Sequence, residues 1–290
     1  MDAPRHSDGQ GEAYECPDLL SIARRGGSET NRFIVPTEEQ RAAFVELASV
    51  LVAEGEGARL RTSAMAEALG FELRDVPGWP GVVIVREVST ARRGGGAYLF
   101  RLDRRNSLVV QAPHTFFDEG TLPLSCELFV RARAAVLFID TAHRYKAAEA
   151  DADGEFPADM AHSTKSFFQA ATEGTLRKLT GATVVQLHGF GERAAPFNVV
   201  LSNGERVAAD PLVVRAEQAL SGVVPTGIVR FPDEIDELGA TTNVQGPLVR
   251  RYRGRFLHVE MAAKLRRELL ATARLRGLFL DALTSALEQP

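Results

Sequence analysis

The chain has 290 residues, of which 45% are apolar and 25% are charged, and its formal net charge is -4. This composition is typical of one large or two small globular domains, and it argues against a nucleic acid or an anionic membrane as partner. No apolar run is long enough to cross a membrane, and the polar N-terminus lacks the apolar core of a signal peptide. We therefore expect a cytoplasmic protein, unless a signal peptide has been removed.

The first third of the chain is predicted to precede the main domain. Residues 1–36 are rich in Gly, Ser, Asp and Pro, and are interpreted as a tail or surface wrap. Residues 37–105 are expected to form helices and a β-meander packed on the core. The helices are predicted at residues 37–54 and 61–69, and the strands at residues 71–76, 81–88 and 97–103.

From residue 106 to residue 290 the sequence alternates between strand and helix patterns. Strands are predicted at residues 107–113, 134–140, 182–190, 198–204, 226–231 and 255–262. Helices are predicted at residues 120–133, 162–179 and 210–222, with one long closing helix at 263–288. This alternation predicts an α/β fold with a mixed, mostly parallel sheet and helices on both faces.

The two cysteines, Cys16 and Cys126, are too few for a disulfide framework, and no CxxC spacing typical of a zinc site occurs. Cys126 lies in an apolar helical pattern, LPLSCELFV. A small apolar residue in such a pattern is usually buried. We therefore expect Cys126 to be a buried thiol.

Two histidines end strongly apolar predicted strands, His114 in LVVQAPH and His188 in TVVQLH. Binding sites of an open α/β sheet form beyond the carboxyl ends of its strands, so these side chains are expected to converge. Glu119 lies five residues after His114, where the loop enters the next helix. Asp118 is a competing candidate, because a spacing of four also permits convergence. Two histidines and one carboxylate leave a fourth position open for water, which is typical of catalytic zinc.

The segment PHTFFDEGT (residues 113–121) resembles the His-Gly-Gly-x-Ile-Glu-x-Gly-Thr signature of phage and bacterial poly-γ-glutamate hydrolases. Those enzymes belong to the zinc carboxypeptidase-like fold, shared more distantly with N-formylglutamate amidohydrolases and aspartoacylases. The resemblance extends over about residues 106–288. It implies a zinc site of His114, Glu119 and His188, with Glu260 as the general base.

The sequence departs from that signature directly after the first histidine, where the glycines are replaced by Thr115, Phe116 and Phe117. Phenylalanine side chains at these positions would narrow the rim of the metal site. The resemblance alone therefore does not assign the family's substrate to this chain.

Glu260 lies near the end of the last predicted strand, shortly before the closing helix. His258 alternates with Glu260, so both side chains are expected on one face of the sheet, where His258 could orient the site or simply be buried. The alternative role of Glu260 is an ion pair with Arg266 or Arg267 that ties down the helix. A buried glutamate without such a partner is costly, which favours a functional role.

Three further residues are candidates for binding substrate. Arg144 follows the strand at residues 134–140, a neighbourhood that in the resembled fold supplies an arginine for a substrate carboxylate; the alternative is a solvated loop arginine. His162 could face the site, or only precede a helix capped by Ser163. Asn243 could line a pocket or belong to a plain turn.

These observations together predict a zinc-dependent hydrolase that cleaves an amide bond. The expected substrates are small molecules or peptides with a free carboxylate, such as acyl-amino acids, short peptides and γ-glutamyl or cell-wall peptides. The alternatives are an N-acetylmuramoyl-alanine-type zinc amidase and a carboxypeptidase-like binding module without catalysis. A serine hydrolase and a nucleotide-binding protein are disfavoured, because neither a GxSxG, a Walker nor a GxGxxG pattern occurs.

Overall fold

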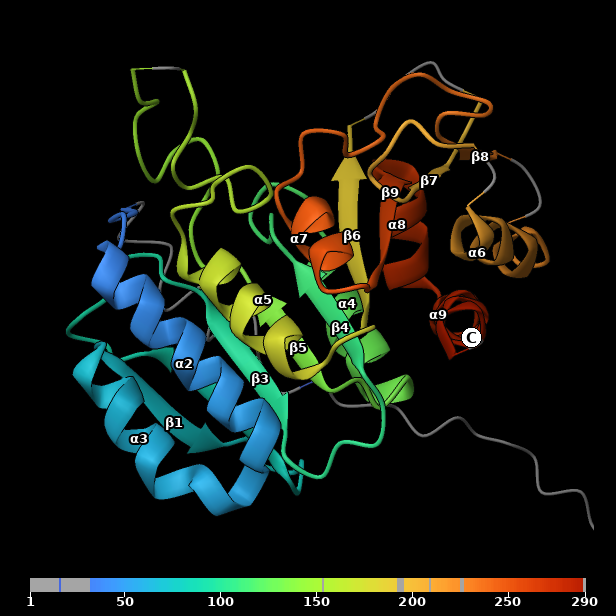
Figure 1. The fold of residues 1–290 in the computed structure, drawn as a ribbon. Coiled ribbons are helices and arrows are strands. Elements are labelled where there is room, and N and C mark those ends of the chain that lie inside the picture. The colour runs from blue at the N-terminus through green and yellow to red at the C-terminus, as the bar shows by residue number, and fades with distance from the viewer. Residues whose placement is uncertain are drawn as a thin grey trace, which may run out of the picture.

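A computed structural model of the chain describes residues 16, 32–152, 154–191, 196–208, 210–224 and 227–288. Most of the tail predicted for residues 1–36 lies outside the described residues. The described chain forms a nine-stranded sheet with helices on both faces (Figure 1). The strands are β1 Phe71–Asp75, β2 Val82–Glu87, β3 Ala97–Arg101, β4 Leu108–Ala112, β5 Val136–Ile139, β6 Thr183–Phe190, β7 Val199–Ser202, β8 Ile228–Arg230 and β9 Arg255–Ala262.

The helices cover most of the predicted helical segments. They are α2 Glu38–Glu54, the short 3-10 helix η1 Gly55–Ala58, α3 Arg59–Ala68, α4 Thr121–Arg131, α5 Phe167–Lys178, α6 Pro211–Ser221, α7 Gln245–Arg251, α8 Ala263–Ala271 and α9 Ala273–Glu288. Thr37 caps α2 through a reciprocal pair of hydrogen bonds with Gln40.

Three helical predictions need correction. The helix predicted at residues 162–179 begins at Phe167, and Ser166, not Ser163, caps it. The closing helix predicted at residues 263–288 is two helices, because Thr272 has an extended backbone that interrupts the hydrogen-bond ladder between α8 and α9. The structure also contains α7, for which no helix was predicted. Its seven residues are too few to produce a periodic apolar pattern in the sequence.

The sheet is mixed, as predicted, with the strand order β1-β2-β3-β5-β4-β6-β9-β7-β8. The four central strands β5, β4, β6 and β9 run parallel, whereas β1, β2 and β3 continue the sheet as an antiparallel meander beside β5. On the other side, β7 pairs antiparallel with β9 and parallel with β8. The predicted meander is therefore part of the same sheet.

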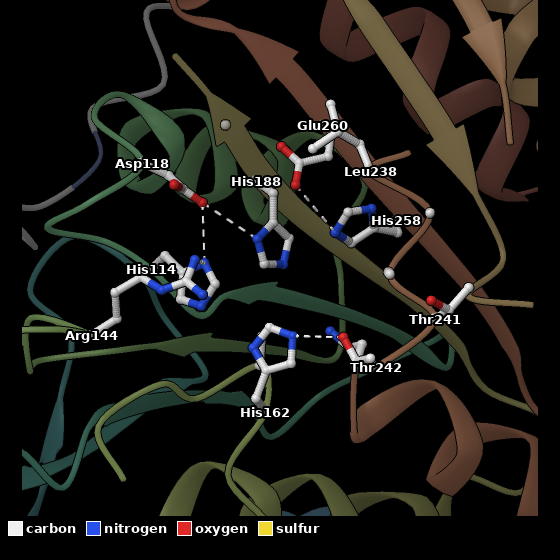
Figure 2. A pocket seen from close by; sticks show the side chains of 15 residues that line it. His114, Asp118, Arg144, His162, His188, Leu238, Thr241, Thr242, His258 and Glu260 are labelled. Carbon is white, nitrogen blue, oxygen red and sulfur yellow. Dashed lines mark hydrogen bonds and ion pairs between the residues drawn. The ribbon is translucent and has the colours of Figure 1, made fainter. Parts of the chain in front are cut away.

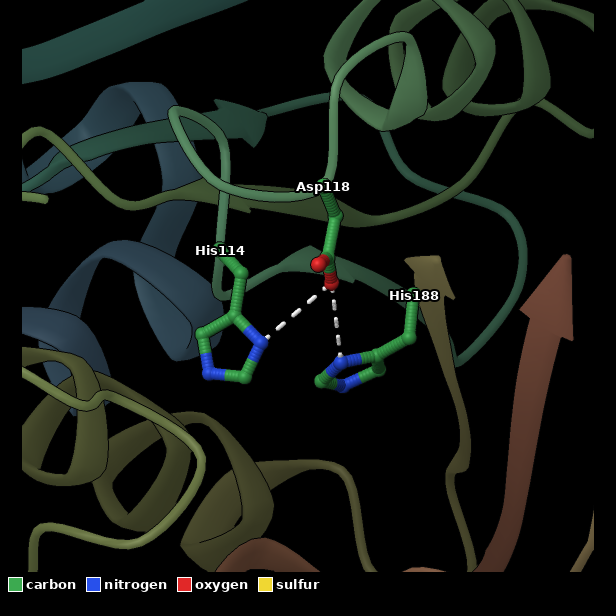
Figure 3. Close-up of side chains that lie close together, drawn as sticks. All are labelled: His114, Asp118 and His188. Carbon is green, nitrogen blue, oxygen red and sulfur yellow. Dashed lines mark hydrogen bonds and ion pairs between the residues drawn. The ribbon is translucent and has the colours of Figure 1, made fainter. Parts of the chain in front are cut away.

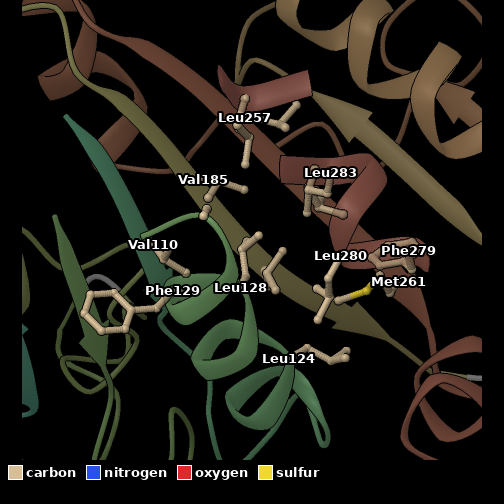
Figure 4. Packing of buried hydrophobic residues seen from close by; sticks show 14 of the residues in the cluster. Val110, Leu124, Leu128, Phe129, Val185, Leu257, Met261, Phe279, Leu280 and Leu283 are labelled. Carbon is tan, nitrogen blue, oxygen red and sulfur yellow. The ribbon is translucent and has the colours of Figure 1, made fainter. Parts of the chain in front are cut away.

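Each face of the sheet is covered by its own apolar core. Neighbouring residues of a strand point to opposite faces, and Val109 and Val110 of β4 accordingly belong to different clusters. One core packs against α4, α6 and α9 (Figure 4). The other packs against α2, α5 and α7. This arrangement buries the central parallel strands on both sides and leaves their carboxyl ends open for a site.

The expectation of a free thiol at position 126 is wrong, because Cys16 and Cys126 form a disulfide bond. Cys126 is buried in α4, as expected, and the bond attaches residue 16 to this helix. Disulfides are typical of oxidising compartments, so this bond does not favour the predicted cytoplasmic location. Within the described ranges no helix combines the length and apolarity needed to cross a membrane.

Candidate metal centre

The side chains of His114, Asp118 and His188 converge near the carboxyl ends of β4 and β6 (Figure 3). His114 Nδ1 and His188 Nδ1 each lie 3.3 Å from Asp118 Oδ2. The ligand atoms of the three residues all lie within 4.8 Å of one another, and all three residues are buried. The convergence of the two histidines, predicted from their positions at strand ends, is therefore present in the structure.

The structure brings Asp118, and not Glu119, to the two histidines. The chain after His114 forms a helical turn, in which the amides of Phe117 and Asp118 both donate to the carbonyl of His114. Residues four apart in such a turn lie on the same side, whereas the fifth is rotated away. Asp118 consequently faces His114, while the side chain of Glu119 is exposed.

The outer nitrogens of both histidines are held by hydrogen bonds. His114 Nε2 lies 2.8 Å from Asp159 Oδ1, and His188 Nε2 lies 3.2 Å from Gln186 Oε1. Asp159 is 4% exposed and also accepts hydrogen bonds from the backbone amide of Ala161 and from Arg144. Outer partners of this kind are typical of metal-ligating histidines, because they fix the ring and leave the inner nitrogen free.

The donors and acceptors around His114 leave a place for either a proton or a cation between His114 and Asp118. Hydrogen bonds from His114 and His162 outweigh burial and hold the pKa of Asp159 below its ordinary value, so its carboxylate can only accept. His114 Nε2 must then carry a proton, and Nδ1 of the neutral ring has a lone pair that faces Asp118 Oδ2. Two acceptors at this distance repel unless a proton or a cation lies between them. Two imidazole nitrogens and one carboxylate oxygen form a donor set that fits zinc.

Burial and the short distances between His114, His188 and Asp118 also shift the pKa values of all three residues. Burial opposes protonation of His114, but the hydrogen bonds to Asp118 and Asp159 outweigh it and raise its pKa to about 9. Burial, reinforced by the nearby His114, lowers the pKa of His188 to about 4. Asp118 is buried as well, yet its hydrogen bonds with both histidines hold its pKa below the ordinary value.

Glu260 and His258 lie beside the three residues, as Figure 2 shows, and both line the same cavity of about 250 Å³. Glu260 Oε1 lies 3.7 Å from His258 Nε2, and the ring centroids of His258 and His188 are 4.4 Å apart. Glu260 Oε2 and His258 Nδ1 are buried and have no hydrogen-bond partner among the described residues. Burial, with the negative charge of Asp118, raises the pKa of Glu260 to about 8.

Arg266 is directed away from an ion pair with Glu260. Its guanidinium donates to the backbone carbonyls of Glu119, Phe190 and Met261. A Cβ atom at Gly189 would lie 2.0 Å from Arg266 Nη1, so the absence of a side chain there makes room for this arrangement. The carboxylate of Glu260 therefore remains directed toward the cavity.

The three predicted substrate-binding residues all line the cavity. Arg144 lies against the rings of Phe117 and Tyr145. It pairs with Asp159, and its Nη1 lies 3.3 Å from His114 Nδ1. It is the only lysine or arginine among the described residues that line the cavity. The substrate-binding role of Arg144 stays a prediction.

His162 and Asn243 differ in the exposure of their side chains. His162 Nδ1 lies 3.0 Å from Asp159 Oδ1, and its Nε2 lies 3.0 Å from Thr242 Oγ1. Asn243 is 3% exposed; its Nδ2 donates to Gln186 and its Oδ1 accepts two backbone hydrogen bonds. Both ring nitrogens of His162 have partners as well, but its side chain is 31% exposed and can be reached by a ligand, whereas Asn243 is buried. The substrate-binding roles of both residues stay predictions.

The sequence reasoning missed two residues of this centre, Asp159 and Gln186. Asp159 lies in the irregular segment before α5, where no pattern singled it out. Gln186 was visible as a polar residue in an otherwise apolar strand, two positions before His188, and Gln111 stands in a similar context before His114.

No protein-family model matches the chain, and no curated protein matches it. Among solved structures, it is similar to a bacteriophage poly-γ-glutamate hydrolase (16% identity, TM-score 0.43, covering 63% of this chain and 84% of the other). It is also similar to an N-formylglutamate amidohydrolase from Ralstonia eutropha JMP134 (16% identity, TM-score 0.46, covering 67% and 97%). A metallo-carboxypeptidase from Burkholderia cenocepacia has 12% identity and a TM-score of 0.45, covering 88% and 70%.

These structural neighbours bear the names of the families to which the motif at residues 113–121 pointed. At these identities, and with TM-scores below 0.5, the similarities assign neither an activity nor a residue role to this chain. The function must therefore be argued from its own side chains.

Proposed function

We propose that the chain is a metal-dependent hydrolase of amide bonds. The observation that carries the proposal is the convergence of His114 Nδ1, His188 Nδ1 and Asp118 Oδ2 in a cavity that also contains the unpartnered Glu260 Oε2. His114, His188 and Asp118 would hold the cation, for which we propose zinc. Asp118 replaces Glu119 in this proposal, because it is the carboxylate that faces both histidines.

A zinc ion bound by this set of residues supplies Lewis acidity, which polarises a carbonyl group and makes a water molecule more acidic. Glu260 Oε2 would accept a proton from the attacking water and return it to the nitrogen of the leaving amine. A carboxyl group with a pKa of about 8 is suited to exchange protons near neutral pH. The positive charge of a bound cation would shift this pKa downward and favour the form that accepts a proton.

We propose substrates that are small and carry a free carboxylate near the scissile amide, such as acyl-amino acids or short peptides, including γ-glutamyl and cell-wall peptides. A cavity of about 250 Å³ is smaller than typical pockets for drug-sized ligands and suits a group of amino-acid size. Arg144 is the candidate partner of the carboxylate. Asp159 engages its Nη2 and would hold the guanidinium in place.

Glu260→Gln tests this mechanism, with Glu119→Gln as the matched control at an exposed glutamate. Each variant would be loaded with zinc and assayed on a panel of N-acyl amino acids and dipeptides. Glu260→Gln should keep the metal while hydrolysis falls by about 10²–10⁴-fold, the usual contribution of a general base. Glu119→Gln should keep both the bound zinc and the hydrolytic activity. Near-normal activity of Glu260→Gln would contradict the proposed base.

The competing function is a carboxypeptidase-like module that binds a ligand without cleaving it. Glu260 argues against it, because a buried carboxyl group without a hydrogen-bond partner at one oxygen is costly, and proton transfer during catalysis would give this group a role. The same assay decides between the two. A wild-type protein that binds zinc and substrate but releases no amine would favour the binding module.

A further inference from the structure

A network of buried amide side chains lies behind His188 and converges on Gln186. Gln186 Nε2 donates to Gln111 Oε1 at 2.7 Å and to Gln245 Oε1 at 3.0 Å, which uses both of its hydrogens. Gln186 Oε1 receives Asn243 Nδ2 at 2.7 Å and lies 3.2 Å from His188 Nε2. Gln111, Gln186 and Gln245 are all fully buried. A buried amide group of this kind is stable only when its donors and acceptors all match.

The orientation of Gln111 follows from a backbone carbonyl. Thr172 Oγ1 donates to the carbonyl of Phe168 at 2.8 Å, and a carbonyl can only accept. With its hydrogen used there, the Thr172 hydroxyl must accept the hydrogen bond from Gln111 Nε2 at 2.9 Å. Gln111 therefore presents its oxygen to Gln186, and Gln186 must present its amide nitrogen in return.

Two further anchors lead to the same orientation of Gln186. Gln245 Nε2 donates to the backbone carbonyl of Met160 at 2.9 Å, so Gln245 presents its oxygen to Gln186. Asn243 Oδ1 accepts hydrogen bonds from the backbone amides of Gln245 and Gly246, so Asn243 presents its nitrogen to Gln186. Through Gln111, Gln245 and Asn243, backbone groups thus fix the orientation of the Gln186 amide. Turning this amide over would place oxygen against oxygen or nitrogen against nitrogen at all three contacts.

We infer that Gln186 is a positioning residue that holds His188 in the tautomer with its proton on Nε2, leaving the lone pair of Nδ1 for the cation. An oxygen that cannot be exchanged for nitrogen faces Nε2. A protonated Nε2 can donate to this oxygen, whereas an Nε2 lone pair would repel it. The competing tautomer, with the proton on Nδ1 toward Asp118, would set the Nε2 lone pair against Gln186 Oε1. At 3.3 Å, the contact of Nδ1 with Asp118 is longer than an ordinary charge-assisted hydrogen bond, so it competes weakly with the fixed oxygen of Gln186.

The inference deepens the proposed function: the role of this tautomer in metal binding rests on that function. The tautomer itself can be measured without any metal. His114 reaches the same state by another route once it has lost its second proton, because the carboxylate of Asp159 then holds the remaining proton on Nε2. The two rings would therefore present Nδ1 lone pairs to one point, one held by a carboxylate and the other by a neutral amide. Such preorganisation strengthens metal binding, and losing an outer partner typically costs 10–100-fold in affinity.

The test is nitrogen-15 NMR of the histidine rings in the purified protein, metal-free and zinc-loaded, together with zinc affinities from a chelator competition. In both forms of the wild type we expect His188 to carry its proton on Nε2. Gln186→Met, which keeps the volume and removes the amide, should lose that preference in the metal-free protein and bind zinc about 10–100-fold more weakly. Gln186→Glu, protonated in this buried position, still presents an acceptor and should restore the tautomer.

Gln111→Met is the matched control, because it removes a neighbouring buried amide that does not contact His188. It should lower stability while the tautomer of His188 and the zinc affinity stay near the wild-type values. A proton on His188 Nδ1 in the metal-free wild type would overturn the inference, and so would an unchanged tautomer and affinity in Gln186→Met. A wild type that shows the Nε2 proton but binds no metal would support the inference and contradict the proposed function.

Discussion

His188 and Glu260 are paired residues of the adjacent parallel strands β6 and β9. Paired residues of a parallel ladder point to the same face, so the register of the sheet alone places a carboxylate beside this histidine. Gln186 and His258 form the paired position two residues earlier. A candidate ligand, its outer partner and the candidate base are therefore positioned by two strands of the core, which hold side chains more rigidly than loops do.

Asp118→Asn should abolish tight zinc binding, whereas Glu119→Gln should leave it unchanged. Asp118 faces both histidines in the buried centre, while Glu119 is exposed. Loss of a direct ligand should weaken binding by more than the roughly 10–100-fold expected for an outer partner. Zinc affinities of the two variants, measured side by side, check this assignment. Strong binding by Asp118→Asn together with weak binding by Glu119→Gln would restore the original assignment of Glu119.

Arg144→Ala should raise KM for a substrate with a free carboxylate far more than for the corresponding amide. Arg144 is the only lysine or arginine among the described residues that line the cavity. A charge-assisted hydrogen bond contributes about 1.5–3 kcal/mol, which corresponds to roughly a 10–150-fold change in KM. Steady-state kinetics on the matched pair of substrates measures the difference. Equal effects on both substrates would refute recognition of a carboxylate by this residue.

Zinc should bind more tightly as the pH rises toward about 9. The hydrogen bonds to Asp118 and Asp159 raise the pKa of His114 to about 9, so its ring is protonated at neutral pH and must lose that proton to become a ligand. Below this pKa, the release of one proton makes the apparent affinity rise about tenfold per pH unit. Chelator competition between roughly pH 6 and 9 follows this slope. An affinity that does not change with pH would contradict protonation of His114.

Cys16→Ser should lower the free energy of unfolding by about 2–5 kcal/mol, the usual cost of removing a native disulfide. The bond joins positions 110 residues apart and attaches residue 16 to α4. Denaturant unfolding with and without a thiol reductant measures the effect. The reductant should destabilise the wild type and leave Cys16→Ser unchanged. Rapid labelling of two thiols in the native, non-reduced protein would show that the bond is absent.

Much of the fold could be predicted because its strands have a clear sequence pattern. The strands β4, β5 and β6 are buried on both faces, so each reads as a nearly continuous apolar run. The break at Thr272 could not be predicted, since the apolar spacing continues through it from α8 into α9. The disulfide could not be predicted either, because the sequence does not show that Cys16 lies next to Cys126 of α4.

The candidate site was predicted to the extent that strands position it. His114, His188 and Glu260 follow or end central strands, and the topology brings them to one edge of the sheet. The choice between Asp118 and Glu119 depends on the helical turn after His114, which the spacing alone did not determine. Asp159 comes from an irregular segment, and its contact with His114 spans 45 residues of sequence.

The metal content of the purified protein tests the central claim most directly. The protein would be incubated with excess zinc, freed of unbound metal by gel filtration and examined by elemental analysis beside His188→Ala. Three converging ligands predict about one zinc ion per wild-type chain and a large loss in the variant. A folded wild-type protein that retains no divalent metal, or a His188→Ala variant that retains as much as the wild type, would contradict the proposed metal centre.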